Sequence, residues 1–172
     1  MSDTATVTQP SDREVQVVRS FNAPRTTVYR AFTEPALVRR WMLGPPGWTM
    51  PICEMDVRVD GRYRWVWRSE TDSSAFGFSG TYLEVEPDSR LVHTERFDAG
   101  TIGGGYPDSA SRVMTTFAET GGITTVTALM DFGSKEARDA AVATGMTDGM
   151  EQSYALLDRH LAEMPTAPAP GS

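Results

Sequence analysis

The chain has 172 residues, 40% of them hydrophobic and 23% charged, a composition typical of one soluble globular domain. Its formal net charge of −7 argues against a protein that binds nucleic acid nonspecifically, because such proteins need clusters of basic residues. The single cysteine, Cys53, excludes an internal disulfide. No apolar run reaches the roughly 18 residues of a membrane-spanning helix, and the first residues lack the pattern of a signal peptide. The sequence therefore predicts a cytoplasmic domain without membrane insertion.

The two ends of the chain show no hydrophobic periodicity. Residues 1–13 are mostly polar, and residues 165–172 read P-T-A-P-A-P-G-S. Both segments are predicted to be disordered tails, because neither offers side chains for a packed core. One domain over residues 14–164 remains.

A strand followed by two short helices opens the domain. The strand is predicted at Glu14–Phe21, and Pro24 begins a helix, because proline in the first helical turn loses no hydrogen bond. Pro35 ends this helix and opens a second one, since the residue before a proline disfavours helix. Apolar residues recur at helical spacing in both helices, at Val28, Ala31 and Phe32 and then at Leu37, Val38 and Trp41.

Residues 48–130 alternate between apolar and polar side chains, which is the period of strands with one buried face. Turn residues divide the stretch, among them Asp60-Gly61, a pair that favours a hairpin. The predicted strands are 49–59, 62–69, 76–86, 90–97, 111–119 and 123–130. With the opening strand they make about seven, joined by short connections, so we expect an antiparallel meander.

From Ser134 onward the period becomes helical. Ser134 is a good N-cap, and the residues after it predict one helix of about 28 residues, long enough to cross the sheet. Gly145 and Gly149 lie inside this helix at a cost to helix propensity, so we interpret them as a place where a backbone or a ligand approaches closely. The apolar stripe of the helix consists of Val142, Met146, Met150, Tyr154, Leu157 and Leu161.

The order of these elements resembles the START-like, or SRPBCC, superfamily, and the motifs resemble its branch of activator of heat-shock protein 90 ATPase homologues. The motifs are R-S-F-N-A-P, F-T-E-P, W-x-x-G-P-P-G from Trp41 to Gly47, D-V-R-V-D-G-R-Y-R-W from Asp56 to Trp65, G-T-Y-L-E-V from Gly80 to Val85, and H-T-E-R-F-D from His93 to Asp98. The resemblance implies an α+β helix-grip fold, in which a curved antiparallel sheet of about seven strands wraps around a long C-terminal helix. The superfamily includes lipid and sterol carriers, hormone receptors, polyketide cyclases and co-chaperone domains, so the fold does not by itself select an activity.

Aromatic and sulfur-containing side chains are the candidates for lining a cleft between sheet and helix. Tyr63, Trp65 and Trp67 alternate along one strand and therefore share a face, where they either line an apolar cavity or fill the core. Met146 and Met150 lie one helical turn apart, and flexible thioethers suit apolar ligands as well as core gaps. The expected ligand-binding residues are Trp41, Tyr63, Trp65, Trp67, Phe78, Tyr82, Met146, Met150 and Tyr154.

Glu95 is the candidate catalytic residue. If Phe97 faces inward, then so do Glu95 and His93, because strand faces alternate. A carboxyl group in an apolar cavity can act as a general acid or base, whereas the alternative is a structural ion pair with Arg96 or Arg138. His93 has no partner close in sequence and is expected to be a structural residue.

No metal or cofactor site is expected. Two distant histidines and one cysteine do not form a cluster with the spacing of metal ligands. The glycine-rich segment 100–106 lacks the lysine and the strand-to-helix context of a phosphate-binding loop. We therefore expect a long loop there between two strands.

Three functions remain open. The favoured one is binding of an apolar or aromatic small molecule between sheet and helix. The second is an enzyme of the cyclase, dehydratase or hydrolase type that uses Glu95 as acid or base. The third follows from the resemblance alone and is a chaperone-associated interaction protein. Both a monomer and a homodimer are compatible with the sequence.

Overall fold

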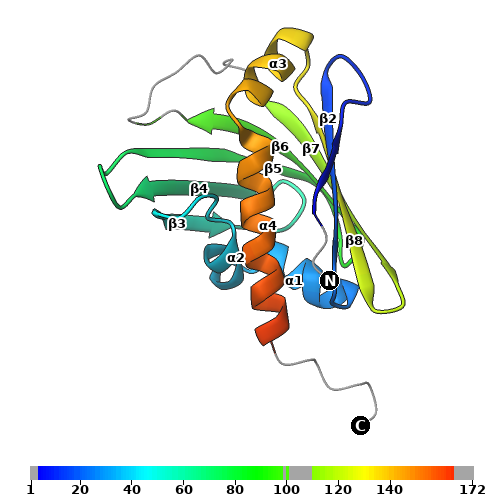
Figure 1. Ribbon diagram of the computed structural model, residues 1–172. Coiled ribbons are helices and arrows are strands. Elements are labelled where there is room, and N and C mark those ends of the chain that lie inside the picture. The colour runs from blue at the N-terminus through cyan, green and yellow to red at the C-terminus, as the bar shows by residue number, and fades with distance from the viewer. Residues whose placement is uncertain (1–3, 99, 101–109, 165–172) are drawn as a thin grey trace.

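The computed structural model describes residues 4–98, 100 and 110–164. It contains one antiparallel sheet of eight strands in the order β1-β2-β8-β7-β6-β5-β4-β3. Figure 1 shows the C-terminal helix lying across one face of the curved sheet, which confirms the predicted α+β helix-grip fold. The predicted tail at 165–172 and most of the predicted loop at 100–106 lie outside the described residues.

The strands and helices follow one another as the sequence periodicity indicates. The strands are β1 (Thr6–Thr8), β2 (Glu14–Phe21), β3 (Trp48–Met55), β4 (Arg62–Ser69), β5 (Ala75–Glu86), β6 (Arg90–Asp98), β7 (Ser111–Thr120) and β8 (Ile123–Asp131). The helices are α1 (Arg25–Thr33), α2 (Pro35–Trp41), α3 (Lys135–Ala143) and α4 (Met146–Glu163). In the part of the chain that the structure describes, no helix is both long and apolar enough to cross a membrane.

The sheet has one strand more than predicted. Strand β1 lies within residues 1–13, which were predicted to form a tail, and it pairs with the edge of β2, with Val7 opposite Val17. All three residues of β1 are exposed, so the strand carries no alternation of apolar and polar side chains. It is attached through its backbone, and the Ala5 N–H also donates a hydrogen bond to Oε2 of Glu151 on α4 at 2.8 Å. Hydrophobic patterning could not reveal such a strand.

The other strand boundaries agree with the prediction within one residue, except at 49–59. Strand β3 ends at Met55, because residues from Asp56 to Gly61 form a tight turn in which Asp60 has a φ of 68°. Within this turn the Gly61 N–H donates to the Arg58 carbonyl oxygen at 2.8 Å. The Asp60-Gly61 pair therefore correctly predicted a turn, but the turn begins several residues before that pair.

The two prolines begin the helices that close one end of the sheet. Pro24 is the N-cap of α1, and Pro35 occupies the first turn of α2. The indole Nε1–H of Trp41 donates to the Ala31 carbonyl oxygen at 2.9 Å and so ties α2 to α1. The Trp41 ring also lies 4.8 Å from the Phe32 ring, centroid to centroid. This end of the layer is therefore filled by core side chains.

The prediction of one continuous helix after Ser134 is wrong, because the structure has two helices there, α3 and α4. The predicted N-cap is confirmed, since Ser134 Oγ accepts a hydrogen bond from the Ala137 N–H at 3.1 Å. Gly145 then adopts a left-handed conformation with a φ of 80° and separates α3 from α4. Among the described residues, no atom outside the adjoining backbone of the chain lies within 4 Å of the position that a Cβ would take at Gly145 or at Gly149. The prediction that a backbone approaches these glycines closely is therefore wrong, and Gly145 supplies a left-handed backbone conformation instead.

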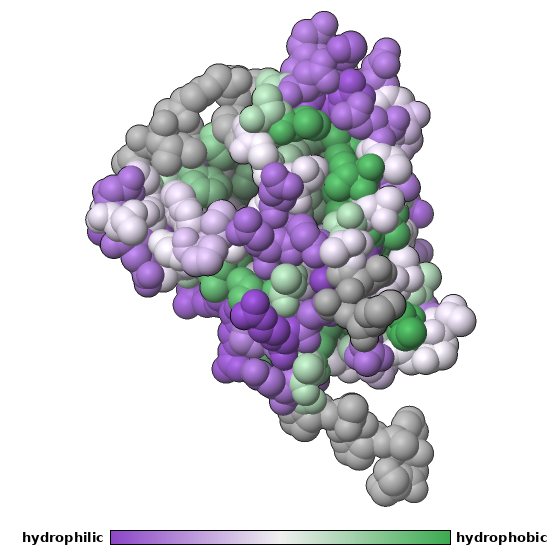
Figure 2. All heavy atoms as spheres, viewed as in Figure 1, coloured by the Kyte–Doolittle hydropathy of each residue, from purple (hydrophilic) through white to green (hydrophobic). Residues whose placement is uncertain are grey.

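A buried arginine attaches α4 to the sheet. The Arg19 side chain, on the inner face of β2, is only 1% exposed. Its Nη2 lies 2.8 Å from Oδ2 of Asp158, and its Nε lies 3.5 Å from Oε2 of Glu151, both on α4. The guanidinium also lies 5.0 Å from the centroid of the Phe21 ring. Figure 2 shows hydrophilic side chains along the outward face of α4. The contacts of α4 with Arg19 are on the side of the helix that faces the sheet.

We predict that Arg19→Met destabilises the domain by about 3 kcal/mol, because removing one partner of a buried ion pair leaves the other charges uncompensated. The matched control is Arg58→Met, since the Arg58 pair with Asp56 is largely exposed and its loss should change the free energy of unfolding by about 0.5 kcal/mol or less. Urea denaturation measures both changes. Equal losses of unfolding free energy in the two variants would contradict the role of Arg19 in attaching α4 to the sheet.

The two helical glycines should respond oppositely to alanine. Gly145→Ala should destabilise by about 1 kcal/mol, because a Cβ is strained at the left-handed φ of that residue. Gly149→Ala should stabilise by about 0.5–1 kcal/mol, because Gly149 lies inside α4 with open space around the added methyl group. Thermal unfolding of the two variants measures whether each substitution raises or lowers stability. A loss of stability in Gly149→Ala would mean that another group packs closely against Gly149.

Candidate ligand-binding site

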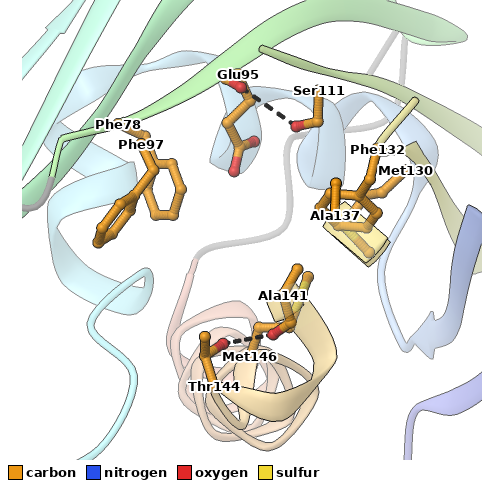
Figure 3. A pocket seen from close by; sticks show the side chains of 10 residues that line it. All are labelled: Phe78, Glu95, Phe97, Ser111, Met130, Phe132, Ala137, Ala141, Thr144 and Met146. Carbon is orange, nitrogen blue, oxygen red and sulfur yellow. Dashed lines mark hydrogen bonds between the residues drawn. The ribbon is translucent and has the colours of Figure 1, made fainter. Parts of the chain in front are cut away.

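A pocket lies between the inner face of the sheet and the segment where α3 leads into α4. Its volume is about 70 Å³. Strands β5 to β8 supply the sheet side of the wall, and α3 with the first residue of α4 supplies the opposite side (Figure 3). The lining residues are Phe78, Glu95, Phe97, Ser111, Met130, Phe132, Ala137, Ala141, Thr144 and Met146.

Strand register brings the sheet side of the wall together. Phe78 on β5 is opposite Phe97 on β6, and Glu95 on β6 is opposite Ser111 on β7. Residues that lie directly opposite in an antiparallel pair present their side chains on the same face. Because Glu95 and Phe97 are two residues apart, the period of a strand turns both toward the helices.

The wall is mostly apolar, and its two hydroxyl groups are already used. Ser111 Oγ donates to the backbone carbonyl oxygen of Glu95 at 3.2 Å, and Thr144 Oγ1 donates to that of Ala141 at 2.6 Å. The Glu95 side chain is 23% exposed and is the one charged group among the lining residues. Figure 3 shows its carboxylate pointing into the space between the sheet and the helices. The pocket therefore combines apolar walls with one carboxylate.

His93 is the neighbour of that carboxylate. Its Nε2 lies 3.4 Å from Oε2 of Glu95, and the residue is 8% exposed. Its ring makes edge contacts with Tyr63 and Tyr82, at centroid distances of 5.2 Å and 5.9 Å. Nδ1 is buried without a hydrogen-bond partner among the described residues. His93 therefore has a partner in Glu95, which the expectation had missed, and the H-x-E spacing on one strand was the signal that could have shown it.

Of the two arginines offered as ion-pair partners of Glu95, Arg138 is excluded. Arg138 Nη1 donates to the Ser11 carbonyl oxygen at 2.8 Å, and its Nη2 lies 3.0 Å from Oδ1 of Asp139. Because these partners lie away from the pocket, Arg138 does not reach the carboxylate. The side-chain contact of Glu95 that the structure describes is the one with His93.

The three aromatic residues of β4 are packed in the core beside the pocket. Tyr63, Trp65 and Trp67 share the buried face of the strand, as their alternation predicts, and pack together with Tyr82. Their rings are close, with 4.4 Å between the centroids of Tyr63 and Trp65. None of these four is among the residues that line the pocket. Of the two alternatives left open by the sequence, the structure thus places them in the core.

Gly80 allows this packing. The Tyr63 hydroxyl donates to the Thr94 carbonyl oxygen at 2.6 Å across strand β5. A Cβ on Gly80 would collide with the same carbonyl oxygen and with the Tyr63 ring. Burial raises the pKa of Tyr63, and the negative charge of Glu95 raises it further, so the phenol remains a hydrogen-bond donor. A glycine at this position is therefore a requirement of close approach.

The remaining predicted ligand residues divide between the pocket and the core. Phe78 and Met146 line the pocket. Trp41 and Tyr154 are buried and lie 6.1 Å apart, centroid to centroid, in the core near α1 and α2, and Met150 packs partly buried against that core. Sequence reasoning did not name Phe97, Ser111, Met130, Phe132, Ala137, Ala141 and Thr144 as site residues, because their assembly depends on register and on where α3 ends.

A second depression lies outside the sheet–helix layer. It has a volume of about 230 Å³ and is bounded by α1, α2 and α4, with Arg40, His160 and Glu163 on its rim. His160 Nε2 lies 2.9 Å from the Arg40 carbonyl oxygen, so its ring serves the contact between α2 and α4. Within residues 4–98, 100 and 110–164 there is no group of three or more metal-ligating side chains.

Solved structures share this architecture. A protein from Rhodobacter sphaeroides is 29% identical with a TM-score of 0.84, over 94% of this chain and 100% of the other. One from Chromobacterium violaceum is 26% identical with a TM-score of 0.75, over 88% and 98% of the two chains. DynU16, a putative protein in the dynemicin biosynthetic locus, is 23% identical with a TM-score of 0.60, over 89% of this chain and 48% of that one, and shows the fold alone.

The family comparison agrees with the motifs in the sequence. No curated protein sequence matches the chain. Residues 22–162 match the family described as Activator of Hsp90 ATPase homolog 1-like protein. This match extends from the end of β2 through nearly all of α4 and so includes the whole pocket. The chain is therefore a member of the Activator of Hsp90 ATPase homolog 1-like family, with the SRPBCC fold.

Proposed function

We propose that this domain binds a small apolar or aromatic molecule in the pocket between the sheet and α3–α4. The observation that carries the proposal is the composition of the wall, in which Phe, Met and Ala side chains surround a single carboxylate. Ligand sites are commonly concave and apolar, with few polar groups that fix the orientation of the ligand. The SRPBCC fold supports the proposal, since it places a curved sheet against a helix in this manner.

The size of the pocket limits the ligand. A volume of 70 Å³ has room for about two water molecules and is about half of the roughly 150 Å³ of an engineered cavity that binds benzene. A ligand that contains a ring must therefore displace side chains of the wall. Met146 is the side chain most able to move, because it is only partly buried, and methionine is unbranched with three rotatable bonds. The pocket can therefore enlarge without a shift of the sheet.

Filling the pocket should abolish binding. We expect Ala141→Phe to weaken binding of toluene, indole or naphthalene at least tenfold, because Ala141 is a buried part of the wall. Ala143→Phe adds the same ring to an exposed position of the same helix and should leave the affinity unchanged. Ligand-observed NMR and native mass spectrometry measure the affinities, and circular dichroism shows whether each variant is folded.

Two results would overturn the proposal. One is the absence of binding to the wild-type protein across the aromatic panel. The other is a folded Ala141→Phe variant that binds as tightly as the wild type, because the site would then lie elsewhere.

A second function is acid–base catalysis by Glu95 on a polyketide-like substrate, as a cyclase, dehydratase or hydrolase. The observation that favours it is the 3.4 Å contact between Glu95 Oε2 and the buried His93, inside an otherwise apolar pocket. A carboxyl group within reach of an imidazole can exchange protons with a bound substrate.

Glu95→Gln separates catalysis from binding. The amide keeps the size of the side chain but cannot transfer a proton as an acid or base, so turnover of poly-β-ketone thioesters should fall at least 100-fold while their affinity stays within a factor of about three. Product formation followed by mass spectrometry measures the first quantity, and native mass spectrometry measures the second. Unchanged turnover would remove Glu95 from any mechanism.

A further inference from the structure

We propose that the preferred ligand of this pocket is a small organic cation, an amine whose ammonium group pairs with Glu95 while its apolar body lies against the phenylalanine rings. This inference rests on the binding function proposed above and names the chemical class of the ligand. Among the described residues that line the pocket, Glu95 is the one that carries a charge.

Few groups among the described residues compensate the charge of the Glu95 carboxylate. The hydroxyl protons of Ser111 and Thr144 are directed to backbone carbonyl oxygens, so neither hydroxyl donates to the carboxylate. Arg138 is held by Ser11 and Asp139. Among the described residues, no hydrogen bond reaches Oε1 of Glu95, and Oε2 has only the long contact with His93. A carboxylate has about four acceptor sites, so most of its capacity is available to a ligand.

His93 favours a negative carboxylate through its hydrogen bonding. No described residue accepts a proton from Nδ1, which is buried. In the neutral tautomer with its proton on Nε2, the one N–H of the ring faces Glu95. A doubly protonated ring would also have an N–H at Nδ1, buried without an acceptor among the described residues. The neutral tautomer points its N–H toward Glu95 at 3.4 Å and adds no positive charge. Its role is to position the carboxylate.

Aromatic rings complete a site for a cation. Figure 3 shows Phe78 and Phe97 on one side of the pocket, Phe132 on the other, and the Glu95 carboxylate directed between them. Phe78 and Phe97 are 5.3 Å apart, centroid to centroid, with their planes at 61°. The faces of aromatic rings attract ammonium groups, and more strongly where water is excluded. Ring faces and a carboxylate together favour a cation over a neutral molecule and repel an anion.

Three ligands of nearly equal size and different charge test the inference. Benzylamine, benzyl alcohol and benzoate carry positive, zero and negative charge at neutral pH. We expect the wild-type protein to bind benzylamine at least tenfold more tightly than benzyl alcohol, and benzoate more weakly than either. In Glu95→Gln the advantage of the amine should disappear, while the affinity for benzyl alcohol stays the same. Isothermal titration calorimetry or ligand-observed NMR measures each affinity.

The control for net charge is Glu84→Gln, which removes one negative charge from an exposed side chain paired with Arg90, outside the pocket wall. It should leave the preference for benzylamine intact, and an equal loss there would overturn the inference as an effect of net charge. Equal binding of amine and alcohol by the wild type would overturn it while the apolar pocket stands. Failure of all probes, with toluene included, would overturn both proposals. The wild-type series decides the charge preference even if Glu95→Gln does not fold.

Discussion

A buried guanidinium attaches the helical layer of this domain to its sheet. Arg19 lies under α4, where its cation meets Asp158 at 2.8 Å and Glu151 at 3.5 Å. Taking ions out of water costs several kcal/mol each, so such a cluster is stable only when its partners are in place together. The charge cluster adds to the apolar contacts of α4 with the sheet, such as that between Tyr154 and Phe21, and ties the helix to Arg19 at two points. Glu151 extends the constraint to the N-terminal segment, because it also accepts the hydrogen bond from Ala5.

With α4 fixed, the pocket forms where core packing ends. One group of buried side chains fills the end near α1 and α2, and another, which includes Tyr63 and Trp67, fills the space above β3 to β5. Small residues of α3, Ala137 and Ala141, face the sheet between these groups and leave space unfilled. The left-handed turn at Gly145 directs α3 away from the line of α4, and a continuous helix would not place those alanines there.

Local signals in the sequence predicted most of the fold. Alternation, the two helix-starting prolines and the Ser134 cap act within a few residues, so they can be identified without knowledge of tertiary structure. Strand β1 could not be predicted, because it is attached by backbone pairing and carries no apolar pattern. The composition of the pocket wall depends on which strands are neighbours in the sheet. Alternation correctly predicted that Glu95 and the β4 aromatics face inward, but only the strand pairing decides that Glu95 lines the pocket and that the aromatics lie in the core. Alternation shows which face a side chain takes, but not whether a neighbour covers it.

Acid–base catalysis and amine binding by Glu95 exclude each other, because the first requires proton transfer and the second requires a stable ion pair. An acid or base must exchange a proton with its substrate, and ketones or thioesters present groups that accept this exchange. An alkylammonium group holds its proton at neutral pH and pairs with a carboxylate as an ion pair, so it offers Glu95 no group for proton exchange. A bound amine would therefore occupy the carboxylate as an ion pair and block proton transfer to any other ligand. It follows that an amine ligand would act as a competitive inhibitor of acid–base turnover by Glu95, because both require the same carboxylate.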